Sequence, residues 1–224
     1  MKRNVLGLIG LFCLLGFPLF AFGAEGFAEQ YRAYQSAAEK GRDAFVRKDY
    51  PVAVAEYSKV IAFTPFEAEI YFRRGVALFK TGKEKEAVPD FDKALLINPR
   101  LVQALSYRGM CHERLGEFVA ALKDHTDALN ANPKDPALYN NLAWLYATAG
   151  DTNVRDPAKA LEHARKAAEL SNSNNAEILD TLASAYFINA RTAEAIETEG
   201  KAVKLMPDNE SLTRHLRDYE QGRK

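Results

Sequence analysis

The stretch AEIYFRRGVALFKTGKEKEAVPDFDKALLINPRL, residues 68–101, decides the fold of this chain. Each half carries apolar or small residues at the spacing of one helix face, namely Tyr71, Gly75 and Leu78 in the first half and Ala87, Phe91 and Ala94 in the second. Gly82 lies between the halves, and Pro99 excludes the residue before it from helical geometry. The stretch therefore predicts a helix, a turn and a second helix.

The same pattern recurs along the chain with a period of 34 residues. Four sets of residues share this period: Gly41, Gly75, Gly109 and Ala143; Ala53, Ala87 and Ala121; Tyr57, Phe91 and His125; Pro65, Pro99 and Pro133. Since several positions share one period, the helical hairpin is a structural repeat.

This combination of period and residue types resembles the tetratricopeptide repeat (TPR) family. The resemblance implies an all-α, right-handed solenoid of five helix-turn-helix repeats with a C-terminal capping helix, and we expect one continuous superhelix rather than separable domains. It also implies that the small residue on each first helix packs against small residues on the second. In the second repeat these are Gly75 against Ala87 and Ala94.

The periodicity divides the chain into segments with definite boundaries. They are a leader at 1–23, a helical lead-in at 24–33, repeats at 34–67, 68–101, 102–135, 136–175 and 176–209, and a capping helix and tail at 210–224. The fourth repeat has a lengthened loop, 150–155, after which Asp156 and Pro157 predict the start of a helix. Asp208 is the expected N-cap of the last helix.

The N-terminus has the pattern of a signal peptide. Lys2 and Arg3 precede an apolar run, and Ala21 and Gly23 provide the small residues of a cleavage site. We therefore expect export, most simply to a bacterial periplasm. The alternative is an uncleaved anchor in the inner membrane facing the periplasm, in which case this segment alone contacts the membrane.

Charge and cysteine content exclude several classes of protein. The 224 residues contain 30 Lys and Arg against 30 Asp and Glu, so the chain lacks the basic field that a nucleic-acid binder needs. Removal of the leader leaves Cys111 as the single cysteine, which excludes an intrachain disulfide.

The resemblance also implies a binding surface, because first helices of this family line a concave groove. The expected groove residues are Arg42, Phe45, Phe72, Val76, Phe79, Met110, Glu113, Asn140, Trp144 and Phe187. Exposed aromatic and Met side chains are typical of protein-binding surfaces, and the amide of Asn140 can bind a peptide backbone. Burial of these residues by neighbouring helices is the competing interpretation.

One ligand class of the family is disfavoured. Family members that hold acidic chaperone tails use Lys, Asn and Arg side chains to grip two carboxylates. The matching positions here are occupied by Ala38, Arg42, Arg73, Gln103 and Tyr107, so that clamp is essentially missing.

Catalytic and metal sites are not predicted. Cys111 and His112 are adjacent on a helix and point in different directions, so they do not form a nucleophile and base pair. His125 is expected to pack or to form a buried hydrogen bond, and His163 and His215 to be solvated. We expect no cofactor and no metal.

Two functions remain open from the sequence. The first is an exported, non-enzymatic scaffold or adaptor that binds a peptide or helix of a partner protein in its groove, in assembly of a cell-envelope complex. The alternative is a membrane-anchored structural subunit that docks through its convex face or its C-terminal helix. The sequence leaves the partner and the oligomeric state open.

Overall fold

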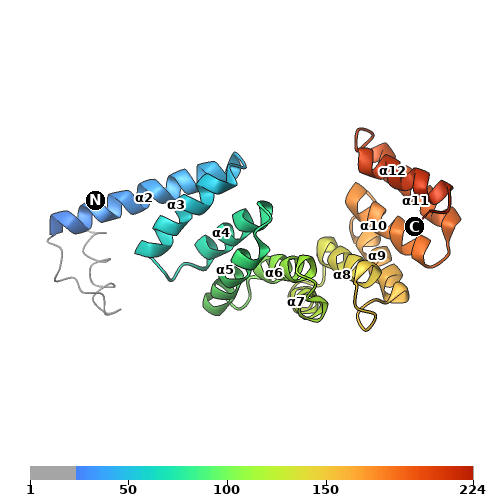
Figure 1. The fold of residues 1–224 in the computed structure, drawn as a ribbon, viewed down its shortest axis with the longest axis horizontal. Coiled ribbons are helices and arrows are strands. Elements are labelled where there is room, and N and C mark those ends of the chain that lie inside the picture. The colour runs from blue at the N-terminus through green and yellow to red at the C-terminus, as the bar shows by residue number, and fades with distance from the viewer. Residues whose placement is uncertain (1–23, 224) are drawn as a thin grey trace. The chain divides into compact units, whose positions relative to one another are not determined.

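The computed structural model describes residues 24–223, and the expected leader at 1–23 lies outside them. All regular structure in the described range is α-helical, as predicted. The helices are α2 (Ala24–Val46), α3 (Tyr50–Phe63), α4 (Ala68–Lys80), α5 (Glu84–Ile97), α6 (Val102–Arg114), α7 (Phe118–Ala131), α8 (Pro136–Thr148), α9 (Pro157–Leu170), α10 (Ala176–Ile188), α11 (Thr192–Leu205) and α12 (Glu210–Glu220). Consecutive helices pair as hairpins (Figure 1).

The described residues form two compact units, 24–65 and 66–223. The expected all-α repeat fold is confirmed, but the chain divides into two units where we expected no separable domains. In the first unit, α2 and α3 bury Ala44, Ala53 and Tyr57 completely. The rings of Tyr31, Tyr34 and Phe63 form a second cluster nearer the start of α2.

The glycine of each early repeat lies against a ring on the second helix. A Cβ atom added to Gly75 would lie 2.8 Å from Cε1 of Phe91, and one added to Gly109 would lie 2.6 Å from Cε1 of His125. In the first unit, Gly41 meets Tyr57 in the same way. The position therefore requires glycine, because the ring on the second helix occupies the space that the Cβ atom of any other residue would need.

Two largely buried ion pairs tie the helices of the second and third repeats together. Arg74 donates to Asp90, and Arg108 donates to Asp124, each through two nitrogens at 2.6–2.8 Å. Arg108 also reaches Asp92 on α5, at 2.6 Å, and so links two repeats. Hydrogen bonds from these arginines to their aspartates raise the pKa of both guanidinium groups.

Turns and caps follow the local sequence closely. Gly82 and Gly116 adopt φ of +73° and +77°, the left-handed geometry that glycine tolerates, between the helices of their hairpins. Asn98 and Asn132 end α5 and α7 just before the prolines. Pro89 lies inside α5, which continues through it.

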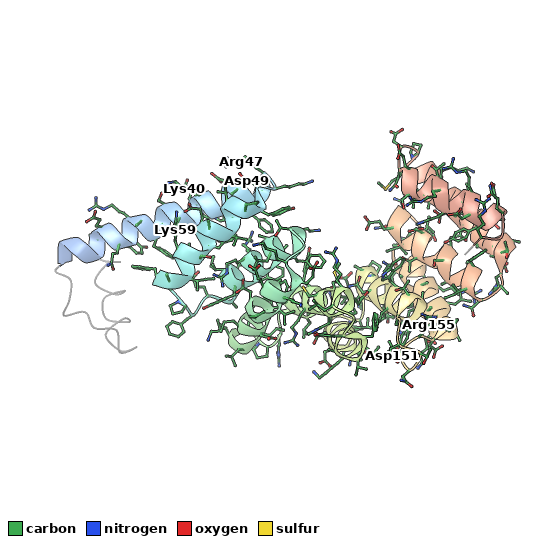
Figure 2. All side chains as sticks on the ribbon, in the orientation of Figure 1. Lys40, Arg47, Asp49, Lys59, Asp151 and Arg155 are labelled. Carbon is green, nitrogen blue, oxygen red and sulfur yellow. The ribbon has the colours of Figure 1, made fainter. Side chains whose placement is uncertain are left out.

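The lengthened loop of the fourth repeat is held by its own polar groups. Asp151 and Arg155, labelled in Figure 2, belong to this loop. Arg155 donates to the carbonyl of Ala149, and the side chain of Asp156 caps α9 by accepting from the backbone N–H of Lys159. The predicted cap at Asp156 is confirmed.

The last helix, α12, covers the end of the second unit. Its N-cap is Asn209, whose side chain accepts from the N–H groups of Ser211 and Leu212, so the expected cap at Asp208 was wrong by one residue. Leu212 and Tyr219 are buried against the preceding helices. None of the helices between residues 24 and 223 has the length and apolar character needed to cross a bilayer.

Candidate functional site

The first helices carry the residues that we expected to line a groove, but the structure divides them into three groups. The first group is packed inside the repeats. Val76 and Phe79 are buried, and the ring of Phe79 lies 5.5 Å from that of Tyr107 and 4.0 Å from the guanidinium of Arg114. These two residues are core rather than groove, because the next first helix covers them.

Three more members of the expected set are also occupied by contacts within their own part of the chain. Phe45 packs on Tyr57 and is half-buried. Glu113 shares a 2.6 Å hydrogen bond with Nε2 of the buried His125. Phe187 packs on Tyr219 of α12, with ring centroids 4.7 Å apart. The capping helix therefore covers the ring of Phe187.

A second group of positions joins consecutive repeats. Phe72 contacts the ring of Tyr107 at 5.9 Å, and Ser106 accepts a 2.9 Å hydrogen bond from Nδ2 of Asn141. Each contact joins a first helix to the first helix of the next repeat. Such residues are covered by the solenoid itself and offer little surface to a partner.

The third group consists of the four remaining members, of which Arg42 and Trp144 are exposed and Met110 and Asn140 are partly buried. Arg42 is exposed on α2 of the first unit. In the second unit, Met110 on α6 and Trp144 on α8 occupy the same repeat position, and Trp144 is 42% exposed. Asn140 lies one turn before Trp144, and its Oδ1 is buried with no hydrogen-bond partner in the described part of the chain. We call Met110, Asn140 and Trp144 the α6–α8 patch.

The clamp positions of the family are engaged by neighbouring side chains in the second unit. Arg73 forms an ion pair with Glu69 at 2.6 Å. Tyr107 stacks on Phe91 at 6.0 Å between ring centroids. The absence of a two-carboxylate clamp stays a prediction from the residue types at these positions.

The cysteine and the histidines of the third repeat are held by contacts within that repeat. Cys111 is fully buried, and burial raises the pKa of its thiol to about 12. His112 shares a hydrogen bond with Glu117, which lies in the turn between α6 and α7. His125 is buried and shares a hydrogen bond with Glu113. The two histidines bind separate acids, so they do not form a pair.

One cluster near the C-terminus was not predicted from the sequence. Nδ1 of His215 on α12 lies 2.7 Å from Oδ1 of Asp180 on α10, so the expectation that His215 is solvated was wrong. Glu199 on α11 is fully buried next to them. Burial, with the nearby charge of Asp180 as a smaller cause, raises the pKa of Glu199 to about 8.

Comparison with solved structures supports the fold. The structure is similar to a thermophilic TPR protein of Thermus thermophilus, with a TM-score of 0.68, 18% identity, and coverage of 84% of this chain and 99% of the other. It is similar to MamA of Desulfovibrio magneticus RS-1, residues 41 to the end, with a TM-score of 0.67, 20% identity, and coverage of 80% and 97%. YrrB, described as a TPR protein with an unusual peptide-binding site, aligns with a TM-score of 0.60 and 20% identity over 80% of this chain and 88% of its own.

Curated relatives resemble the chain over part of its length. A DnaJ homolog subfamily C member 7 homolog of Schizosaccharomyces pombe is 26% identical over 63% of this chain and 31% of its own length. The Hsp70-Hsp90 organizing protein of Triticum aestivum is 22% identical over 70% of this chain and 28% of its own length. The matched region is thus less than a third of each of these relatives.

The sequence model of the tetratricopeptide repeat matches residues 68–101, the stretch in which α4 and α5 form their hairpin. The period, the hairpins and the similar solved structures agree with this match. Residues 68–101 form a tetratricopeptide repeat, and the fold of the chain is that of tetratricopeptide repeat proteins.

Proposed function

We propose that this chain is an exported, non-enzymatic adaptor that binds an extended segment or helix of a partner protein on the α6–α8 patch. The observation that carries the proposal is the exposed indole of Trp144 beside the unpaired Oδ1 of Asn140. Aromatic side chains provide most of the energy of many protein interfaces. The Oδ1 of Asn140 is buried as the side chain lies, so a rotation of this amide would be needed to present it to the N–H group of a ligand.

The chemistry of the patch fits a peptide better than a small molecule. Met110 is flexible and polarizable, so it adapts to varied apolar side chains. The amide of Asn140 can pair with a backbone N–H whatever the peptide sequence is. We infer that the patch recognises the backbone of a bound peptide and one of its apolar side chains.

Export and a role in a cell-envelope complex are part of the proposal. They rest on the signal-peptide pattern of residues 1–23, which lie outside the described structure.

The absence of catalysis is likewise proposed. The burial of Cys111 and the engagement of His112 by Glu117 support it. A variant with Cys111→Ala and His112→Ala should therefore retain full partner binding.

A capture experiment tests the proposal. The chain is immobilised and incubated with envelope extract of the source organism, and bound proteins are identified by mass spectrometry. Asn140→Ala combined with Trp144→Ala should abolish capture of the specific partner, whereas Val119→Ala, a matched change at an exposed residue of α7, should not. Undiminished capture by the double variant would refute the patch as the binding site.

The alternative, docking through the convex face, has one observation in its favour. Leu96 on α5 and Val119 on α7 are 73% and 67% exposed, and both lie on second helices. If Leu96→Ser and Val119→Ser abolish capture while the patch variant does not, this second function replaces the first.

A further inference from the structure

The cluster under the capping helix brings together one side chain from each of the last three helices. Asp180, Glu199 and His215 each offer an oxygen or nitrogen ligand atom, and these atoms all lie within 4.8 Å of one another. The elements α10, α11 and α12 carry them, and Asp180 and His215 are 35 residues apart in sequence. The cluster is thus a product of the fold and not of a local motif.

Glu199 is the unusual member of this cluster. It is fully buried, and neither of its carboxylate oxygens has a hydrogen-bond partner among residues 24–223. Asp180 is close to it, but two carboxyl groups can share a hydrogen bond only if one of them holds a proton. An unpaired buried carboxylate is strongly unfavourable, so such a group needs a proton or a cation.

Packing does not require an acid at this position. Glu199 follows Ala195 by one turn, and the corresponding residues of the other repeats are Tyr57, Phe91, His125 and Ala164. All of these are fully buried. Rings or a methyl group therefore fill the position elsewhere, and a carboxylate here points to a purpose other than core packing.

The ligand set indicates the class of cation. Two carboxylates and one imidazole suit Zn²⁺ and similar divalent transition metals, whereas Mg²⁺ and Ca²⁺ prefer oxygen ligands alone. Atoms about 2.1 Å from one zinc ion lie roughly 3–4 Å apart, so the observed separations need only small side-chain shifts.

Solvent can reach the cluster from one side. The side chains of Asp180 and His215 are 21% and 34% exposed, while Glu199 closes the inner side. A cation can therefore enter past Asp180 and His215 and keep a water molecule as a further ligand. Nearby, Tyr219 on α12 is buried against Ala183 and Ala195.

We propose that Asp180, Glu199 and His215 bind a divalent transition-metal ion, with Zn²⁺ as the expected ion, and that the ion fastens α12 to the last repeat. The bound ion neutralises the buried Glu199 carboxylate and replaces the hydrogen bond between Asp180 and His215. Its role is structural, since it joins the three helices at the end of the second unit.

Metal titration of the full chain tests this site. After dialysis against a chelator, the protein is titrated with Zn²⁺ by calorimetry and with Co²⁺ by visible absorption. We expect one equivalent of either ion to bind, and Zn²⁺ to raise the thermal midpoint. Glu199→Gln and, separately, His215→Ala should weaken binding by at least about tenfold and abolish the thermal shift.

Matched controls distinguish this site from surface binding. Glu197→Gln changes an exposed acid on the same helix, paired with Lys201, and His163→Ala removes a histidine of another repeat. Both should bind Zn²⁺ as the wild type does. Circular dichroism verifies folding, and if Glu199→Gln does not fold, the His215→Ala result decides because His215 lies partly exposed on α12.

Two results would overturn the proposal. One is the absence of stoichiometric binding by the wild type, which would leave a protonated Glu199 as the explanation of the cluster. The other is unchanged binding in folded Glu199→Gln or His215→Ala, which would place the metal elsewhere. Neither result bears on the α6–α8 patch, which is tested by partner capture.

Discussion

Gly109 and His125 occupy complementary positions across the third repeat, because the imidazole ring fills the space that a side chain at Gly109 would need. A Cβ atom at Gly109 would lie 2.6 Å from Cε1 and 2.8 Å from Nδ1 of the ring. In the fourth repeat the same two positions hold Ala143 and Ala164, which lie in one buried cluster. Glycine on the first helix thus accompanies a ring on the second helix, and alanine on the first helix accompanies alanine on the second.

Gly109→Ala should destabilise the protein by about 1–3 kcal/mol, since the buried ring has to move. Urea unfolding followed by circular dichroism measures the change. The double variant Gly109→Ala and His125→Ala, which copies the fourth repeat, should lose less stability than the sum of the two single changes. Strict additivity would contradict a direct steric contact.

Asp124→Ala should destabilise the protein because Asp124 is buried and pairs with Arg108. The change leaves the guanidinium of Arg108, only 20% exposed, without its bidentate partner. We expect a loss of roughly 2–3 kcal/mol in urea unfolding, below the full cost of an unpaired buried charge because Asp92 remains. Lys123→Ala, which breaks an exposed pair on the same helix, serves as the control and should cost less than about 0.5 kcal/mol.

Ala190 adopts a φ of +59° at the turn position that Gly82 and Gly116 hold in other repeats. Left-handed geometry is unfavourable for alanine, so Ala190→Gly should stabilise the protein by about 0.5–1 kcal/mol. Gly116→Ala should have the opposite effect. A lowered unfolding midpoint for Ala190→Gly would show that the alanine is unstrained.

Cys111 should resist alkylation in the native protein. Burial raises the pKa of its thiol to about 12, so the reactive thiolate is scarce at pH 8 and increases only as the pH rises toward 12. Iodoacetamide labelling, quantified by mass spectrometry of the peptide that contains Cys111, should be at least about a hundredfold slower than in urea. Rapid labelling of the native protein would show that the thiol of Cys111 is accessible and reactive, which would contradict this prediction.

Much of the fold was predictable because small, aromatic and proline residues recur with one period. Gly75, Phe91 and Pro99 each have counterparts 34 residues away, and their spacing identifies two helices and a turn. The same spacing did not reveal that the ring of Phe91 lies directly against Gly75. Periodicity shows which residues share a face, but it does not show which side chain reaches furthest across the hairpin.

The candidate sites were harder to predict because exposure depends on neighbouring repeats. Phe79 and Trp144 both lie on first helices, yet Phe79 is covered by Tyr107 while Trp144 stays exposed. Glu199 and His215 looked like ordinary polar residues of amphipathic helices. Their proximity to Asp180 depends on three helices packing together, and the sequence of any one helix carries no sign of it.

Site-specific photo-crosslinking tests partner binding on the α6–α8 patch most directly. A photoreactive phenylalanine replaces Trp144 in one variant and Val119, the exposed residue of α7, in another, and both are irradiated in living cells. We predict a discrete adduct with one partner protein from position 144 and none from position 119. An adduct from position 119 alone, or equal adducts from both positions, would contradict binding at the patch.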